Sequence, residues 1–337
     1  MGLKFHQIFK ELNSKRKIIF EPKVKFFYKH EYSPEEIWIN KEVMVQLNIT
    51  PKCPLNCSFC YIKKRYNCDL SFKKIVKLFN NLEKYNKKLK IVYRVNLTGG
   101  DIFYYYKIEE LLKLLKNSDY VVAVDPLINR LWNNRTKKLL ELIMDKITYI
   151  QMNVSVVKKE DLDYAKEARK IVLLKYPIYK RHEKKMIEKI IRIMKTYENV
   201  WLSFDWIIPQ DKEYAKYCYV SDISDGINEA RKIIELIKKE NLDDRIFTTS
   251  CIIEREIFGR TYLCGVGIQN IYVMPDGKIA VCSRYPFLET KYSIDNFDLI
   301  EYFTKFQKLI SNTCLFENKY FTDFWKIKEN PRYWQNE

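Results

Sequence analysis

Residues 42–61 read EVMVQLNITPKCPLNCSFCY, and this stretch decides how the rest of the chain is interpreted. Its first part, Glu42–Thr50, is a short β-rich run that predicts a strand ending at the proline behind it. Three cysteines follow in the next loop with the spacing C-x3-C-x2-C. A strand that leads straight into such a loop predicts a metal site formed by Cys53, Cys57 and Cys60.

The chain after residue 40 alternates β-rich runs with runs of helical spacing. Six alternations with connections of this length predict a parallel sheet with right-handed crossovers. Because six units are too few for a closed eight-stranded barrel, we expect an α/β fold, a partial (β/α)6 TIM-like barrel with ligands at the carboxyl ends of its strands. The expected strands are Glu42–Thr50, Lys90–Leu97, Tyr120–Val124, Tyr149–Val156, Ile171–Tyr176 and Val200–Ile208, and the expected helices are Leu70–Tyr85, Ile108–Leu115, Thr136–Met144, Leu162–Ala168, Glu183–Tyr197 and Ile223–Lys239.

The length and composition predict three parts that pack together. With 337 residues, 47% of them hydrophobic, the chain can form one large domain and a smaller appendage without disulfides. It has only 10 prolines and 8 glycines and no linker-like stretch. We expect an N-terminal extension over residues 1–40, the partial barrel over 41–215, and a small α+β domain with C-terminal helices over 216–337.

The cysteines also point to a metal. No apolar run approaches the ~18 residues that a membrane-spanning helix needs, and the charged N-terminus has no apolar signal core, so the sequence predicts a cytoplasmic protein. In a reducing cytosol, cysteines serve as thiols, metal ligands or catalysts rather than as disulfides. The chain has 9 of them, and Cys68, which fits no motif, is expected to be a buried thiol, with a reactive thiol as the alternative.

The net charge of +17 leaves the partner open. Lysine pairs are spread along the whole chain, which favours solvated helix faces over one binding surface. The alternative is attraction to an anionic partner, namely an acidic peptide, a phosphorylated metabolite or RNA. Nucleic acid is the less favoured partner, because the basic residues do not form one stripe.

The cysteine loop has the donor set of an iron–sulfur cluster. Three thiolates can ligate three irons of a four-iron cluster, and the open fourth iron can chelate a methionine-type amine and carboxylate. Zinc is the structural alternative, but a closed zinc site needs a fourth ligand, and no second C-x2-C pair lies nearby. The loop resembles the signature of the radical S-adenosylmethionine (radical SAM) superfamily, C-x3-C-x-aromatic-C, with Phe59 as the aromatic residue.

The resemblance extends to the loop after the second expected strand. The sequence Gly99-Gly100-Asp101 stands where the family has Gly-Gly-Glu, so the resemblance implies that these residues bind the methionine amine of S-adenosylmethionine. Asp101 keeps the carboxylate but is one methylene shorter than the usual glutamate. The resemblance further implies roles in binding the ribose and carboxylate of S-adenosylmethionine for polar residues expected at strand ends or on a strand, namely Asp125, Ser155 and Lys175.

A second motif lies in the C-terminal third. Residues 268–274 and 278–281 are two expected strands joined by a Pro-Asp-Gly turn, which predicts a β-hairpin with a cysteine just outside each end. This pattern resembles the SPASM and twitch auxiliary-cluster domains of the same superfamily. The resemblance implies a second four-iron cluster, whose fourth ligand stays open among Cys218, Cys251, another side chain and the substrate; the alternative is a hairpin with incidental thiols. The implied ligands are Cys264, Cys282 and Cys314.

Together these motifs imply an enzyme. Its resemblance to radical SAM enzymes implies reductive cleavage of S-adenosylmethionine to a 5′-deoxyadenosyl radical that takes a hydrogen atom from the substrate, with the electron supplied by a donor such as flavodoxin or ferredoxin. We favour modification of a ribosomally made peptide by epimerisation, cross-linking or oxidation. The alternatives are a small-molecule or nucleotide oxidoreductase, and then an RNA-modifying enzyme or a plain iron–sulfur electron carrier.

Overall fold

The computed structural model describes a large part of the chain. The described residues are 42–55, 57, 60, 62, 66–129, 133–178, 184–206, 223–247, 270–282 and 285–302. Several expectations fall outside them, including the N-terminal extension and the side chain of Cys282, of which only the backbone is described. Outside them as well lie Phe59, Cys218, Cys251, Cys264 and Cys314.

The chain divides into two compact units. Of the described residues, the first contains those within 29–173 and 265–308, and the second contains those within 174–264. Residues 265–308 therefore group with the first half of the expected barrel. The three-part division proposed from the sequence stays a prediction.

Seven strands of one sheet belong to the first unit, in the order β10-β9-β8-β1-β2-β3-β4. The strands β1 to β4 are parallel neighbours. On the other side of β1, β8 is also parallel to it, while β9 and β10 continue the sheet antiparallel. The strand bounds are β1 Glu42–Thr50, β2 Val92–Gly99, β3 Val121–Ile128, β4 Tyr149–Asn153, β8 Asn270–Val273, β9 Lys278–Cys282 and β10 Tyr285–Ser293.

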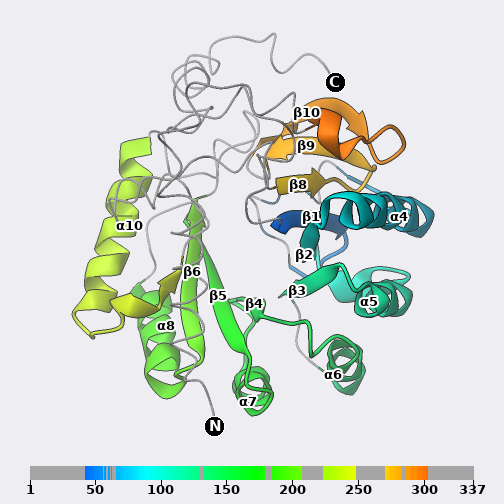
Figure 1. Ribbon diagram of the computed structural model, residues 1–337. Coiled ribbons are helices and arrows are strands. Elements are labelled where there is room, and N and C mark those ends of the chain that lie inside the picture. Colours follow the sequence, from blue (N-terminus) through cyan, green and yellow to red (C-terminus); the bar gives the residue numbers. More distant parts are fainter. Residues whose placement is uncertain are drawn as a thin grey trace. The chain divides into compact units, whose positions relative to one another are not determined.

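Helices cover one face of this sheet because every second strand residue is apolar. Figure 1 shows α4, α5 and α6 along one side of β1, β2 and β3. On β2, Tyr93, Val95 and Leu97 are completely buried, and the Tyr93 hydroxyl donates to the carbonyl of Leu82 in α4 at 3.1 Å. The helices are α4 Phe72–Leu89, α5 Ile108–Asn117, α6 Asn134–Glu141 and α7 Lys159–Glu167, with a short 3-10 helix η1 at Ile102–Tyr104.

The second unit continues the strand–helix alternation. Its strand β6 has a buried core in Val200, Trp201 and Leu202, and it pairs in parallel with the short β7. The predicted α/β fold, a mostly parallel sheet in the manner of a partial barrel, is confirmed. The elements are β5 Ile171–Ile178, which begins at the unit boundary, α8 Lys184–Thr196, β6 Val200–Trp206, α10 Ile223–Lys238, η2 Asp243–Arg245 and β7 Ile246–Phe247.

The predicted hairpin is also confirmed. The strands β8 and β9 are antiparallel, with Tyr272 opposite Ala280, and Gly277 in the turn has φ of 88°, a conformation that favours glycine. The hairpin lies beside β1, because β8 pairs with that strand from Met44 to Leu47.

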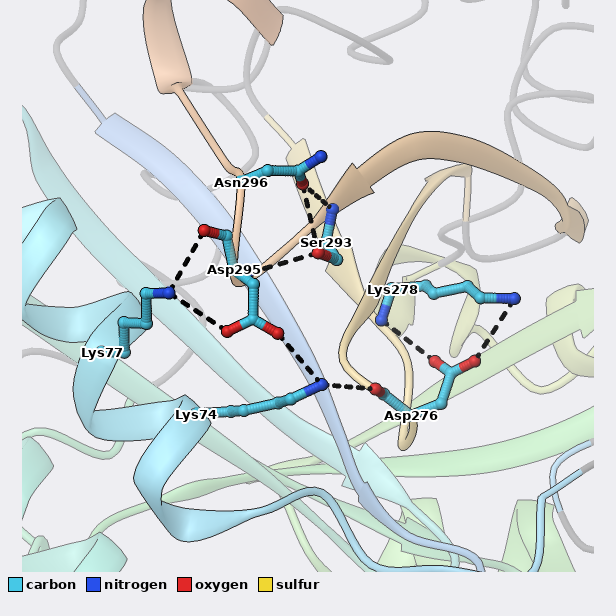
Figure 2. A network of polar contacts seen from close by, with 7 residues as sticks. All are labelled: Lys74, Lys77, Asp276, Lys278, Ser293, Asp295 and Asn296. Carbon is cyan, nitrogen blue, oxygen red and sulfur yellow. Dashed lines mark hydrogen bonds and ion pairs between the residues drawn. The ribbon is translucent and has the colours of Figure 1, made fainter.

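A polar network joins the hairpin segment to α4 (Figure 2). Lys77 Nζ lies 3.1 Å from Asp295 Oδ1, and Lys74 Nζ lies 3.4 Å from the other oxygen of that carboxylate. Lys74 also donates to the carbonyl of Asp276 in the hairpin turn at 3.1 Å. The two lysines lower the pKa of Asp295. Since these side chains are partly exposed to solvent, each pair contributes little to stability.

Among the described residues, no helix is long and apolar enough to cross a lipid bilayer.

Candidate functional site

The three motif cysteines lie on the loop at the carboxyl end of β1. All three cysteines are of intermediate exposure, and the amide of Cys60 donates to the carbonyl of Cys57 at 3.1 Å. Burial raises the pKa of the Cys53 thiol to about 11, and the nearby charges of Asp101, Cys60 and Cys57 add to this. A bound cation would be needed to hold Cys53 as a thiolate at neutral pH.

The start of the cysteine loop is held by a carboxylate that the sequence reading did not single out. Asp69 accepts a hydrogen bond from Thr50 Oγ1 at 2.7 Å and pairs with Lys52 Nζ at 2.9 Å. The amide of Lys52 in turn donates to Thr50 Oγ1 at 3.1 Å. These contacts clamp the segment just before Cys53, so the first thiol leaves the strand in a defined direction.

The end of the loop rests on apolar side chains from the hairpin. Cys60 and Met44 pack against a buried cluster in which Ile62 and Tyr66, from just after the loop, meet three hairpin residues. Those residues are Tyr272, Met274 and Ala280. In addition, Asn48 on β1 donates to the carbonyl of Val273 at 2.9 Å. The hairpin thus supports the cysteine loop, whether or not it holds a cluster of its own.

The Gly-Gly-Asp loop docks directly on the cysteine loop. The amide of Gly100 donates to the carbonyl of Thr50 at 2.6 Å, and the amide of Asp101 donates to that of Lys52 at 2.7 Å. A Cβ atom on Gly100 would lie 2.1 Å from the Lys52 carbonyl oxygen. Gly99 has φ of 120°, and a Cβ there would lie 2.6 Å from the Thr50 oxygen. Glycines are therefore required here for the contact between the two loops, in addition to any contact with a ligand.

Asp101 is completely buried, and both of its carboxylate oxygens accept backbone hydrogen bonds. Oδ1 accepts from the amide of Phe103 at 2.9 Å, which caps η1, and Oδ2 accepts from the amide of Asn129 at 3.0 Å. The side chain of Asn129 returns a bond to the carbonyl of Gly100 at 2.7 Å. Asp101 therefore ties the end of β2 to the end of β3. Its predicted contact with a methionine amine stays a prediction.

This arrangement predicts a loss of stability for Asp101→Ala before any cofactor is added. Removing the carboxylate leaves two buried amides, on Phe103 and Asn129, without their acceptor, so the free energy of unfolding should fall by about 2–4 kcal/mol. Urea denaturation of the cluster-free protein measures this change. The isosteric Asp101→Asn variant is the control for lost volume. If Asp101→Ala unfolds like the wild type but binds S-adenosylmethionine more weakly, the carboxylate serves the cofactor rather than the loops.

The sequence predicted Asp125 at the end of its strand, but the structure places it within the strand. The strand β3 runs through Pro126 to Ile128, because proline fits the β region and lacks only a donor. The Asp125 carboxylate is completely buried and forms an ion pair with Arg94 at 2.9 Å, while the amide of Tyr149 donates to it at 3.3 Å. Burial raises the pKa of Asp125, and the Arg94 guanidinium opposes that rise by stabilising the carboxylate.

Ser155, Lys175 and Cys68 are also placed differently from the expectations. Ser155 lies in the turn after β4, which ends at Asn153, and is exposed, with its hydroxyl bonded to the side chain of Asn153 at 2.7 Å. Lys175 lies within β5 rather than at its end, and its ammonium donates to Ser203 Oγ at 3.1 Å within the second unit. Cys68 is exposed, not buried.

The first unit therefore brings together the three cysteines and the Gly-Gly-Asp loop. Among the described residues, no three histidine, cysteine or acidic side chains converge on a single-ion site. A four-iron cluster does not need such convergence, because each thiolate binds a different iron. The donor set of Cys53, Cys57 and Cys60 fits that cluster better than it fits zinc, which needs four ligands around one point.

Sequence reasoning missed the residues that fasten the two loops. Asp69 and Asn129 lie beyond the motifs, and neither has a distinctive neighbour in the sequence. One weak sequence signal could have indicated Asn129: it is a polar residue directly after a buried apolar strand, β3, where functional sites of parallel sheets occur.

Comparisons with known proteins agree with this geometry. The model of the radical SAM superfamily matches residues 47–253. Among solved structures, SuiB of Streptococcus suis bound to S-adenosylmethionine is similar over 88% of this chain and 69% of its own, with 16% identity and a TM-score of 0.55. The tagged anSMEcpe with bound AdoMet is similar over 85% and 83%, with 13% identity and a TM-score of 0.54. At these identities the structures show a shared fold alone.

No curated protein matches the sequence. The family model nevertheless spans more than half of the chain and includes the end of β1, the cysteine loop, β2 and the Gly-Gly-Asp loop. The chain belongs to the radical SAM superfamily.

Proposed function

We propose that this radical SAM enzyme holds a four-iron cluster through Cys53, Cys57 and Cys60 and modifies a ribosomally made peptide with it. The observation that carries the cluster assignment is the set of three half-buried thiols at the end of β1, with the Gly-Gly-Asp loop docked against them. When bound, the cluster and S-adenosylmethionine together supply reductive cleavage to a 5′-deoxyadenosyl radical, which removes a hydrogen atom from the substrate.

The protein's own part is to position these groups. The Asp69 clamp holds the segment before Cys53, and the hairpin cluster holds the segment after Cys60. The glycines bring the backbone of the second loop close to the first, where a methionine amine and carboxylate would be received. Asp101 fixes the Gly-Gly-Asp loop by accepting hydrogen bonds from the amides of Phe103 and Asn129. An electron donor such as flavodoxin or ferredoxin would supply the one electron that the reductive cleavage consumes.

A second cluster on the hairpin is also part of the proposal, with Cys264, Cys282 and Cys314 as its ligands. Its support is the position of Cys282 at the end of β9, in a hairpin that packs beside the cysteine loop. The wild-type protein should then bind about eight irons and Cys264→Ala/Cys282→Ala about four, because each cluster holds four. Chemical iron analysis after anaerobic reconstitution measures both. About four irons in the wild type would leave the hairpin as a support for the first loop only.

The choice of substrate is tested by hydrogen transfer. The reconstituted enzyme is given S-adenosylmethionine, a reductant and ribosomally made peptides labelled uniformly with deuterium. A peptide substrate should give deuterated 5′-deoxyadenosine and a peptide of altered mass, which mass spectrometry detects. Unlabelled 5′-deoxyadenosine with an unchanged peptide would favour the alternative, a small-molecule or nucleotide substrate.

A further inference from the structure

The strands of the first unit carry polar side chains on the face opposite the helices. On β2, Tyr93, Val95 and Leu97 are buried on the helix side, so the alternating residues Arg94 and Asn96 lie on the other face. These residues are neither fully buried nor exposed. A face that is covered in part and lined by polar groups is unlike the apolar core behind it.

Register places further polar residues beside Asn96. Gln46 of β1 is its partner on one side, and Asp125 of β3 is its partner on the other. Two residues beyond Asp125, Leu127 is paired with Gln151 of β4, which brings that side chain to the same face. We select four half-buried, uncharged polar residues on this face and call them the amide surface; they are Gln46, Asn96, Thr98 and Gln151.

The amide surface has no uncompensated charge from its neighbours on β2 and β3. Arg94 pairs with the carboxylate of Asp125 at 2.9 Å and also donates to Thr148 Oγ1 at 3.0 Å. Its positive charge is therefore balanced by a buried negative one. Among the described residues of β1 to β4, the cation on this face is thus already paired, so a phosphate or a carboxylate would gain little there, whereas a neutral group with donors and acceptors would match the side-chain amides.

Asn96 has hydrogen-bonding capacity that the described part of the chain does not use. Its Oδ1 atom is buried and has no hydrogen-bond partner among the described residues. Its Nδ2 donates only to the thioether of Met44 at 3.2 Å, which is a weak acceptor. A buried acceptor without a donor is unfavourable and marks a place where a ligand or water donates. Met44 packs against the same apolar cluster as Cys60, so this acceptor lies near the cysteine loop.

We propose that the amide surface binds the backbone of a neutral peptide segment, with Asn96 Oδ1 accepting a hydrogen bond from a peptide N–H. This inference rests on the proposed function and specifies which strand residues select the substrate. Gln46 and Gln151 extend the surface to either side of Asn96 and pair with the next peptide groups. The substrate selected in this way is an uncharged stretch of peptide rather than a nucleotide.

The test measures binding of a capped dipeptide, N-acetyl-dialanine-N′-methylamide, to the reconstituted enzyme with S-adenosylmethionine. Equilibrium dialysis of the labelled compound should show binding to the wild type, weakened at least about tenfold in Asn96→Leu. Asn134→Leu makes the same chemical change at an exposed position of α6 and should bind like the wild type. Gln46→Leu should bind more weakly than the wild type as well, which guards against misfolding of a single variant.

Three results would overturn the inference. They are no binding of the capped dipeptide to the wild type, equal binding to Asn96→Leu, and displacement of the dipeptide by an equal concentration of adenosine 5′-monophosphate, which would indicate a nucleotide site. Formation of 5′-deoxyadenosine in the same wild-type preparation distinguishes a failure of the radical SAM assignment from a failure of the peptide-binding role. If 5′-deoxyadenosine forms while the dipeptide does not bind, the proposed peptide-binding role of the amide surface is wrong, and the assignment of the cysteine loop as a radical SAM cluster site stands.

Discussion

Replacing Cys53, Cys57 and Cys60 together by alanine is expected to abolish formation of 5′-deoxyadenosine. The three thiols are the donor set of the cysteine loop, and without them the loop has no soft ligand for iron. The measurement is chromatography of the products after anaerobic reconstitution with iron, sulfide, a strong reductant and S-adenosylmethionine. The expected change is a complete loss of activity rather than a reduced rate, because the cluster performs the cleavage.

Cys68→Ala is the matched control for this variant. Cys68 is an exposed thiol on the same connection between β1 and α4, and it belongs to no motif. Its replacement should leave both iron content and 5′-deoxyadenosine formation unchanged. Undiminished product from the triple variant would contradict the assignment of the cysteine loop as the site of cleavage.

Gly100→Ala is expected to cost about 3 kcal/mol or more in the free energy of unfolding. The new Cβ would lie 2.1 Å from the carbonyl oxygen and 2.6 Å from the carbonyl carbon of Lys52. Both atoms belong to the backbone, so no side-chain rotation relieves the clash, and the two loops must separate. Because the displaced segment leads directly to Cys53, the variant should also retain less iron. Urea denaturation and iron analysis measure the two effects.

Gly277→Ala is the matched control for the glycine prediction. Gly277 has φ of 88°, and an added Cβ would lie 2.9 Å from the side chain of Lys74, which can move. The backbone strain should cost only about 1 kcal/mol, and the cysteine loop should keep its iron. If Gly100→Ala were no more costly than Gly277→Ala, the close contact between the two loops would be disproved.

The sequence by itself determined the parts of this protein that depend on neighbouring residues. Cys53, Cys57 and Cys60 are held together by the covalent connection of one short loop, so their spacing alone predicts a shared site. The hairpin turn at Gly277 is local in the same way, since its conformation depends on a few adjacent residues. The strand β1 was also predicted from its β-rich sequence, and its expected bounds agree with the structure.

The ends of strands were predicted less accurately, because a residue such as proline can end a strand or continue it. Pro126 looked like the end of a strand, yet β3 continues through it to Ile128. Its pyrrolidine ring is compatible with extended backbone, and a missing donor does not prevent pairing. As a result Asp125, expected at a strand end, lies within the sheet, paired with Arg94.

Only the tertiary structure decided which distant groups meet. The bond from Asn48 to Val273 joins residues far apart in the sequence and places the hairpin beside the cysteine loop. In the same way, Asp101 receives the amide of Asn129, and Gly100 has no room for a side chain because Lys52 lies against it. Such contacts depend on which strands become neighbours in the sheet. No local pattern encodes that choice, because it follows from the burial of all the strands together.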